Sequence, residues 1–164
     1  MTRLLHIAAL IAALALAACS NDSCYDNGSS LPLATFYIGN SQQSIPGLSI
    51  MGIAVPGDSL LADGKSIKEA YLPLRANATS TSYALWRTFT VTGSTTTVTV
   101  RDTVTLDYQA VPYFHSAECG AMYNVDIKQV THTTHGIDSV VMITTHITNS
   151  LTPALRIHFT DLSQ

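Results

Sequence analysis

Charged residues are scarce in this sequence of 164 residues, because Asp, Glu, Lys and Arg together make up only 12% of it. Aromatic residues make up 7%, with one Trp, and there are three Cys residues. So few basic residues argue against nucleic acid or an anionic membrane surface as a partner. After residue 18, no apolar run approaches the roughly 20 residues that a transmembrane helix needs.

The sequence also lacks the usual motifs of catalysis and metal binding. No Ser lies in a Gly-x-Ser-x-Gly frame, and Asp22 and Asp26 do not begin the acidic ladder of a calcium loop. Residues three apart in a strand point to opposite faces, which argues against a shared metal at His132 and His135. We therefore expect no enzyme, no metal and no cofactor, with solvent-facing histidines at His132, His135, His146 and His158.

The one long apolar run lies at the N-terminus, where residues 4–18 follow Arg3 and are interrupted only by His6. This layout is typical of a secretory signal peptide. The run ends in Leu16-Ala17-Ala18-Cys19, which resembles the lipobox of bacterial lipoproteins. The resemblance implies cleavage before Cys19 and acylation of Cys19 by several fatty chains such as palmitate, which anchor a protein durably to a bilayer. The alternative is an ordinary signal peptide, with Cys19 a plain thiol.

Removing residues 1–18 from the 164 leaves 146, the size of one domain. Seven basic and eleven acidic residues remain, which gives a net charge of −4. Residues 19–32, rich in Ser, Asn, Asp and Gly, predict a lipidated tether, and residues 33–164 predict the folded domain. Ser20 rather than Asp follows Cys19, which favours the outer membrane; the periplasmic and surface faces both stay open.

Two cysteines remain after Cys19. In the oxidising envelope such a pair is typical of a disulfide, here between Cys24 and Cys119. The bridge would close a loop of 95 residues, worth about 4–5 kcal/mol in the chain-entropy description. Two free thiols are the alternative.

Alternation of apolar and polar residues with period two predicts β-strands along the whole domain. It is clearest over residues 98–108, which follow residues 83–91 in a hairpin. Asp102 falls on the apolar phase, which predicts a β-bulge there. Shorter candidate strands are residues 35–39, 48–55, 59–62, 67–74 and 155–159, and a second hairpin is expected to join residues 122–131 to 139–148 around residues 135–138.

About eight strands without helical periodicity predict an all-β fold. We expect an immunoglobulin-like antiparallel β-sandwich, with a small lipocalin-like β-barrel as the alternative. Several segments, namely Pro56-Gly57-Asp58-Ser59-Leu60-Leu61, Leu72-Pro73-Leu74, Ser116-Ala117-Glu118-Cys119-Gly120, Ile137-Asp138-Ser139-Val140 and Ile157-His158-Phe159, together resemble an uncharacterised family of small Bacteroidetes lipoproteins. The resemblance implies a lipoprotein with a β-sandwich domain and the Cys24–Cys119 bridge, and it implies no activity.

The leading functional hypothesis is a non-catalytic accessory of the cell envelope that binds another protein or assists assembly. The alternative is a glycan- or small-molecule-binding protein, with Trp86 and Tyr83 as ligand contacts; a Trp86 in the core between two sheets is the interpretation that competes with this. Three segments resemble the O-glycosylation motif of Bacteroidetes, Asp followed by Ser or Thr and an apolar residue. Their acceptor residues are Ser59, Thr103 and Ser139.

Overall fold

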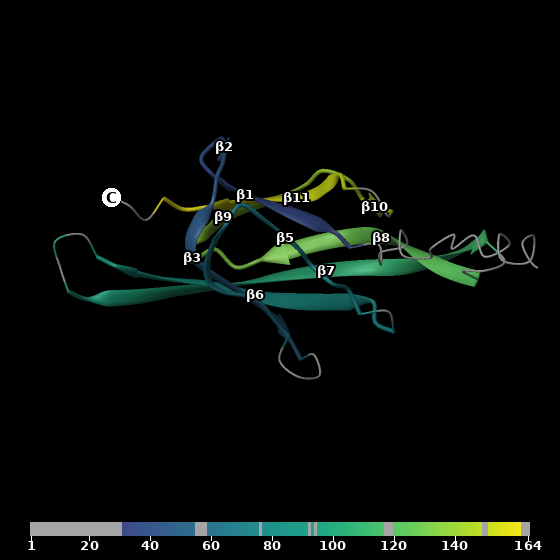
Figure 1. Cartoon of the computed structure of the whole chain (residues 1–164), viewed down its shortest axis with the longest axis horizontal. Coiled ribbons are helices and arrows are strands. Elements are labelled where there is room, and N and C mark those ends of the chain that lie inside the picture. Colours follow the sequence, from purple (N-terminus) through teal and green to yellow (C-terminus); the bar gives the residue numbers. More distant parts are fainter. Residues whose placement is uncertain are drawn as a thin grey trace, which may run out of the picture.

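Two β-sheets make up the part of the chain that the computed structural model describes, residues 31–54, 59–75, 77–91, 93, 95–116, 120–148 and 151–161 (Figure 1). Within these residues there is no helix. The strands are β1 (Leu33–Ile38), β2 (Ser41–Gln42), β3 (Ile45–Ile53), β4 (Leu60–Ile67), β5 (Glu69–Tyr71), β6 (Ser80–Thr90), β7 (Thr97–Ser116), β8 (Gly120–His132), β9 (Ile137–Met142), β10 (His146–Ile147) and β11 (Pro153–Phe159).

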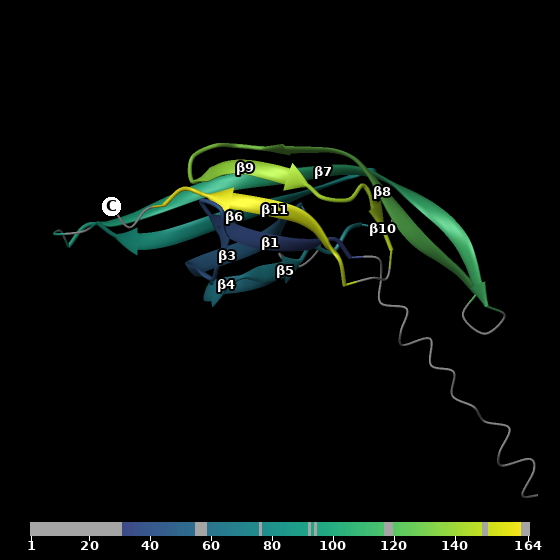
Figure 2. The same ribbon diagram turned by 90° about the horizontal axis from the view of Figure 1, so that it is seen from above.

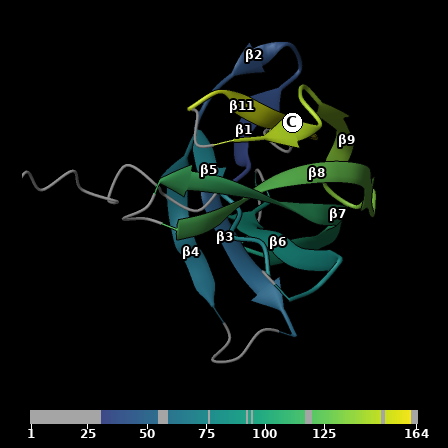
Figure 3. The ribbon, with the colours of Figure 1, turned by 90° about the vertical axis from the view of Figure 1, so that its right-hand side faces the viewer.

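The two sheets differ in size. The small sheet has the order β2-β1-β11-β9, with β5 also paired to β1, and the large sheet has the order β10-β8-β7-β6-β3-β4. Strands β1 and β11 run parallel, and the other pairs are antiparallel. Figure 3 shows one sheet packed on the other. The prediction of an all-β sandwich is confirmed, and because the described strands form two separate sheets, the lipocalin-like alternative is not adopted.

The core lies between the sheets and follows the alternation in the sequence. In β11, Leu155, Ile157 and Phe159 are at most 2% exposed, whereas Arg156 between them is exposed. In β7 the inward residues are Val104, Leu106 and Tyr108, as the alternation predicts. The other large, fully buried side chains are those of Tyr83, Phe36, Ile45, Leu48, Ile50, Leu72, Leu85, Ile127 and Ile137.

Strand β4 is longer than the sequence predicts. The candidate strand was expected to end at residue 62, but β4 continues through Asp63 and Gly64 to Ile67. Gly64 has a φ of +57°, which only glycine adopts readily. Its N–H donates to Ser49 Oγ at 2.8 Å, so the chain passes through an irregular ladder with β3 without leaving the sheet.

The expected second hairpin is wrong for β9 and right at its far end. His146 and Ile147 of β10 pair antiparallel with Asp126 and Val125 of β8 in the large sheet, as expected, whereas β9 belongs to the small sheet and pairs with β11. Residues 133–136, which we call the crossover, carry the chain from one sheet to the other. The local sequence predicts a turn there, but the strand that pairs with β9 is β11, which lies further along the chain. Local alternation does not show which distant strand a given strand pairs with.

The expected bulge at Asp102 is also wrong. Asp102 pairs with Leu85 in an uninterrupted ladder between β6 and β7. Its side chain therefore points into the sandwich, where it is 3% exposed. The crossover supplies the hydrogen bonds that make this burial tolerable, as described below.

The large sheet is longer than the small one and reaches past it at both ends (Figures 1 and 2). At the β6–β7 end lies the hairpin that joins these two strands, and at the β7–β8 end lies the hairpin that joins β7 to β8. The start of β1 lies toward the β7–β8 end, because Leu33 pairs with Pro153, and Pro153 closely follows β10, which pairs with β8.

Gly136 in the crossover leaves no room for a side chain, and this generates a first prediction. A Cβ at position 136 would lie 2.7 Å from Val100 Cγ1. We expect Gly136→Ala to lower the free energy of unfolding by about 1–3 kcal/mol, as overpacking does, in urea denaturation. In a Val100→Ala background, which removes that methyl group, the same substitution should cost clearly less.

The exposed neighbour Thr134→Ala serves as the control and should change stability by no more than about 0.5 kcal/mol. An equal cost of Gly136→Ala with and without Val100 would contradict the steric explanation.

Candidate functional site

Asp102 and Arg87 are the charged residues that the described part of the chain buries, at 3% and 7% exposed. Asp102 Oδ1 accepts hydrogen bonds from Thr133 Oγ1 at 2.6 Å and from the His135 backbone N–H at 2.8 Å. Its Oδ2 accepts from the Gly136 backbone N–H at 2.7 Å. The carboxylate is thus satisfied by three donors of the crossover.

Arg87 ties the same crossover to the end of β11. Its Nη2 donates to the carbonyl oxygens of Gly136 and Thr160, at 3.4 and 3.0 Å. The guanidinium carbon lies 4.9 Å from the centre of the Phe159 ring, a cation–π distance. Burial lowers the pKa of Arg87, and the negative charge of Asp102 opposes that shift. The opposite charges of Arg87 and Asp102 therefore hold three segments together: the β6–β7 ladder, the crossover and the end of β11.

The pKa of Asp102 reflects two opposing effects. Burial raises it, but the hydrogen bonds from Thr133, from the backbone of His135 and Gly136 and from the His135 ring outweigh burial and hold the pKa below its usual value. Hydrogen bonds to a carboxylate favour its charged form. Asp102 is therefore a carboxylate anion in the folded protein, stabilised by the hydrogen bonds that the crossover donates.

The cluster does not have the geometry of a catalytic triad. His135 Nδ1 lies 3.1 Å from Asp102 Oδ1, and the His135 side chain is 69% exposed. In a triad the imidazole stands between the hydroxyl and the carboxylate. Here the Thr133 hydroxyl and the imidazole both bind the same carboxylate oxygen, so the imidazole does not stand between the hydroxyl and the carboxylate. This arrangement holds the crossover in place.

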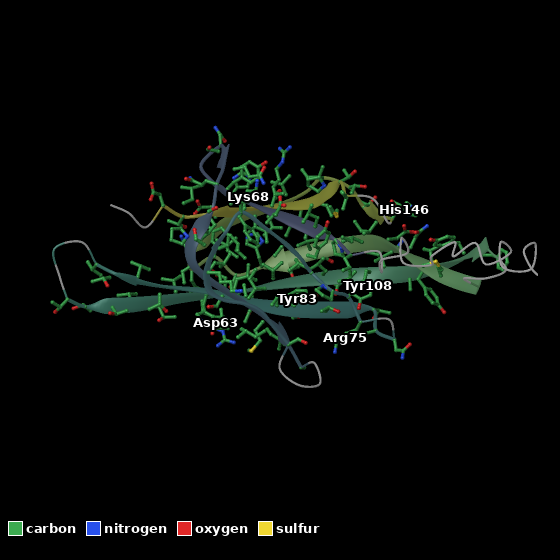
Figure 4. All side chains as sticks on the ribbon, in the orientation of Figure 1. Asp63, Lys68, Arg75, Tyr83, Tyr108 and His146 are labelled. Atoms are coloured by element: carbon green, nitrogen blue, oxygen red, sulfur yellow. The ribbon has the colours of Figure 1, made fainter. Side chains whose placement is uncertain are left out.

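Tyr83, predicted as a ligand contact, is instead a buried residue. It is 2% exposed, and its hydroxyl donates to the Pro73 carbonyl oxygen. Nearby, the Tyr108 hydroxyl donates to the Arg75 carbonyl oxygen at 2.7 Å and lies 2.8 Å from Thr81 Oγ1. Burial, and then the proximity of Tyr108, raises the pKa of Tyr83. The two tyrosines fasten the segment before β6 to the sandwich (Figure 4).

Trp86 lies on the outer face of the large sheet. It is half-buried and pairs with Arg101 in the ladder between β6 and β7. The Arg101 guanidinium carbon lies 5.2 Å from the centre of the Trp86 ring. The ring is therefore not in the core between the sheets, and a cation already lies over one of its faces.

Three of the four histidines have separate hydrogen-bond partners. His146 Nδ1 lies 2.7 Å from Asp126 Oδ1, and His158 Nδ1 donates to the Gly39 carbonyl oxygen at 2.9 Å. His135 contacts Asp102, as described above, and His132 is half-buried in β8. Among the described residues, no three His, Cys, Asp or Glu side chains lie close enough together to hold a metal ion.

The structure describes only some of the remaining predicted sites. Cys19, Cys24 and Cys119 lie outside the described residues, as does the predicted signal peptide. Ser59 is exposed just before β4, while Thr103 in β7 and Ser139 in β9 are half-buried. Within the described ranges no helix is long and apolar enough to span a membrane.

Sequence reasoning missed the uncovered ends of the large sheet. At the β7–β8 end, the inward-facing Phe114 and Tyr123 are 72% and 55% exposed. At the β6–β7 end, Phe89 and Val98 are half-buried and Val91 is 41% exposed. Their alternation is that of core residues, and only the shorter opposite sheet leaves them in solvent. The alternation predicted a strand only over residues 98–108 and did not show this mismatch, because β7 has 20 residues in the structure and β11 has seven.

Comparison with protein families finds one match, over residues 47–159, to a model described as a family of unknown function, DUF6452. The match spans all strands from β4 to β11 and most of β3. No curated protein matches the chain, and no solved structure does.

The buried carboxylate generates a second prediction. An amide cannot accept the hydrogen bonds that both Asp102 oxygens receive, so Asp102→Asn should lower the free energy of unfolding at neutral pH by about 3 kcal/mol. Because the folded pKa of Asp102 is lowered, its contribution is complete above the unfolded pKa of about 4 and is lost as the pH falls below it. The difference in the free energy of unfolding between the natural protein and Asp102→Asn, measured by urea denaturation, should therefore become smaller from pH 7 to pH 3.

Asp63→Asn, at an exposed residue of β4, is the control for removing one negative charge and should stay within about 0.5 kcal/mol of the natural protein. If the free energy of unfolding of Asp102→Asn differs from that of the natural protein by the same amount or more at low pH, the assignment of Asp102 as a buried anion is contradicted.

Proposed function

Because the chain belongs to DUF6452, a family of unknown function, we propose its role from the molecule itself: a lipid-anchored, non-catalytic accessory of the bacterial cell envelope that binds another protein. The lipobox-like sequence at Cys19 and the resemblance to small Bacteroidetes lipoproteins support the anchor, and the outer membrane is the compartment that Ser20 favours. The β6–β7 end is the surface that we assign to the partner.

The β6–β7 end carries the proposal because it is an amphipathic hairpin without a covering sheet. Phe89 and Val98 form a ladder pair on its inner face, with Val91 beside them. Thr88 and Thr99 form the next pair on the outer face, where their hydroxyl oxygens lie 2.9 Å apart. A two-stranded hairpin is only marginally stable alone, so covering the inner face would stabilise it. Apolar surface on a partner protein fits this face.

The direction of the chain supports the same assignment. Strand β1 starts toward the β7–β8 end, whereas Arg87 and Thr160, at the end of β11, meet toward the β6–β7 end. A domain held by a tether before β1 would thus present the β6–β7 end away from the membrane. A partner in the aqueous compartment would meet this end first.

A non-catalytic role agrees with how the polar groups near the crossover are used. The Asp102 carboxylate binds the backbone and the ring of His135 in the crossover, and this ring does not stand between a hydroxyl and the carboxylate as the imidazole of a catalytic triad does. The alternative of a glycan-binding protein now depends on Trp86 alone, because Tyr83 is buried. Trp86 is the only Trp in the sequence, so its fluorescence would report a glycan bound near it.

The third prediction concerns this partner. A photoreactive phenylalanine analogue placed at position 89 in the native host should crosslink to one recurrent envelope protein, identified by mass spectrometry. The analogue at position 90, which faces the opposite side of the same strand, should give little of that product. Phe89→Ser should reduce copurification of the partner, whereas Thr90→Ser should not.

Circular dichroism and thermal unfolding of these variants establish that the domain remains folded. Equal crosslinking from both faces, or none from either, would contradict a partner on the inner face. In that case a change of Trp86 fluorescence on a glycan panel would support the alternative function.

The fourth prediction concerns glycosylation, which the three sequence motifs suggest. Ser59 is exposed before the edge strand β4, whereas Thr103 lies in the interior strand β7 and is half-buried. Since an enzyme needs access to the hydroxyl, we expect Ser59 to carry the glycan. The intact mass of protein from the native host should exceed that of the acylated chain without glycan, and Ser59→Ala but not Thr103→Ala should remove the excess. A single mass equal to that of the acylated chain without glycan would refute the proposal.

A further inference from the structure

The β7–β8 end has an exposed apolar surface of its own. Phe114 and Tyr123 are 72% and 55% exposed, and Pro112, the ladder partner of Tyr123, is also exposed. These residues continue the inward phase of Tyr108 and Val125, which are buried further back along the same two strands. The surface is therefore the core face of the large sheet, extended beyond the small sheet that covers the rest of it. Leu151, before β11, is 79% exposed as well.

This part of the chain is almost without charge. Between Asp107 and Asp126 the sequence contains one charged residue, Glu118. The charges resume where the hairpin meets the sandwich, at Asp126, which lies 3.6 Å from Lys128 Nζ and 2.7 Å from His146 Nδ1. From Asp126 to Gly120, six residues of strand span about 20 Å. A nearly uncharged, aromatic segment thus ends at a group of charged residues.

The position of this end relative to the start of the chain indicates what covers it. Strand β1 begins toward the β7–β8 end, since Leu33 pairs with Pro153 and β10 pairs with β8. Leu33 lies 14 residues after Cys19, a length that spans at most about 50 Å when extended. A lipid on Cys19 would therefore keep the hairpin close to the bilayer, with enough chain for its aromatic residues to reach the surface.

We propose that the β7–β8 end lies on the surface of the lipid bilayer, with Phe114 and Tyr123 in the interfacial layer, and that this contact orients the domain. The inference rests on the proposed acylation of Cys19. Tyr and other aromatic side chains favour the membrane interface, where one part of the ring is apolar and another is hydrated.

The backbone sets the depth of this contact. The last residue of β7 that pairs with β6 is Asp107, so no described strand covers that edge of β7 toward the hairpin. Backbone N–H and C=O groups need partners, which the hydrocarbon core of a bilayer does not supply. The hairpin therefore rests at the hydrated interface and does not cross the bilayer. The lack of basic residues means that the contact depends on apolar burial and only weakly on anionic lipid.

The test places an indole at each end of the large sheet in the full, acylated chain. In a Trp86→Phe background, Phe114→Trp reports on the β7–β8 end and Phe89→Trp on the β6–β7 end. Both proteins are reconstituted in vesicles of phosphatidylethanolamine and phosphatidylglycerol, with and without brominated acyl chains, which quench indole fluorescence on contact. We expect brominated lipid to quench most of the fluorescence of F114W and little of that of F89W.

Adding Tyr123→Ser to F114W should restore much of the lost fluorescence. Thr90→Ser, a matched change at the other end, should have no effect. Replacing phosphatidylglycerol by phosphatidylcholine should leave the quenching nearly unchanged, because few charges take part.

The possible results separate this inference from the proposed anchor. Protein that floats with vesicles but shows no quenching of F114W is anchored without the contact, which overturns the inference alone. Protein that does not float with vesicles lacks the anchor, which overturns both. Stronger quenching of F89W than of F114W would reverse the orientation, and crosslinking of position 114 to a protein in place of lipid quenching would assign this end to a partner.

Discussion

The buried carboxylate of Asp102 is the constraint on which the packing of the two sheets depends. It lies in the first third of β7 and binds three donors of residues 133–136, where the chain leaves the large sheet for the small one. Without those hydrogen bonds, a charge at 3% exposure would be very costly. Without the charge, the crossover would lose the acceptor that fixes its direction. The hydrogen bonds from the crossover stabilise the buried charge of Asp102, and the charge in turn holds the crossover in place.

Arg87 extends this arrangement to the end of the chain. Its guanidinium reaches Gly136 and Thr160 and lies over Phe159, so the crossover, β6 and β11 meet at one point. Removing one partner of such a buried cluster is more destabilising than its net contribution suggests, because the other charge stays buried. The cluster has residues that occur in catalysis, but every polar atom described in it serves to join the segments.

The unequal length of the sheets explains the surfaces that we assign to partners. Strand β7 has 20 residues and spans the molecule, and the strands of the small sheet have at most seven. The core face of the large sheet is therefore covered in the middle and exposed at both ends (Figure 2). One end is aromatic and nearly uncharged, and the other combines apolar residues with threonines. A protein tethered before β1 would use the first toward the membrane and the second away from it.

Much of this fold could be read from periodicity. The inward residues of β7 and β11 and the hairpin of β6 and β7 follow from alternation, because a strand exposes successive side chains to opposite faces. Asp102 is the exception to this alternation. It lies on the apolar phase, for which a β-bulge was the local explanation. Its actual explanation, three donors about 30 residues away, is a tertiary contact that no local pattern contains.

The all-β class and the inward and outward faces of the strands follow from the amino-acid sequence, because period-two alternation is a local property of strands. The pairing of β9 with β11, the burial of Tyr83 by the segment at Pro73 and the exposure of Phe114 and Tyr123 follow only from the way distant segments pack. All three depend on which distant segment covers a face, and burial is a property of that pairing, not of the residue.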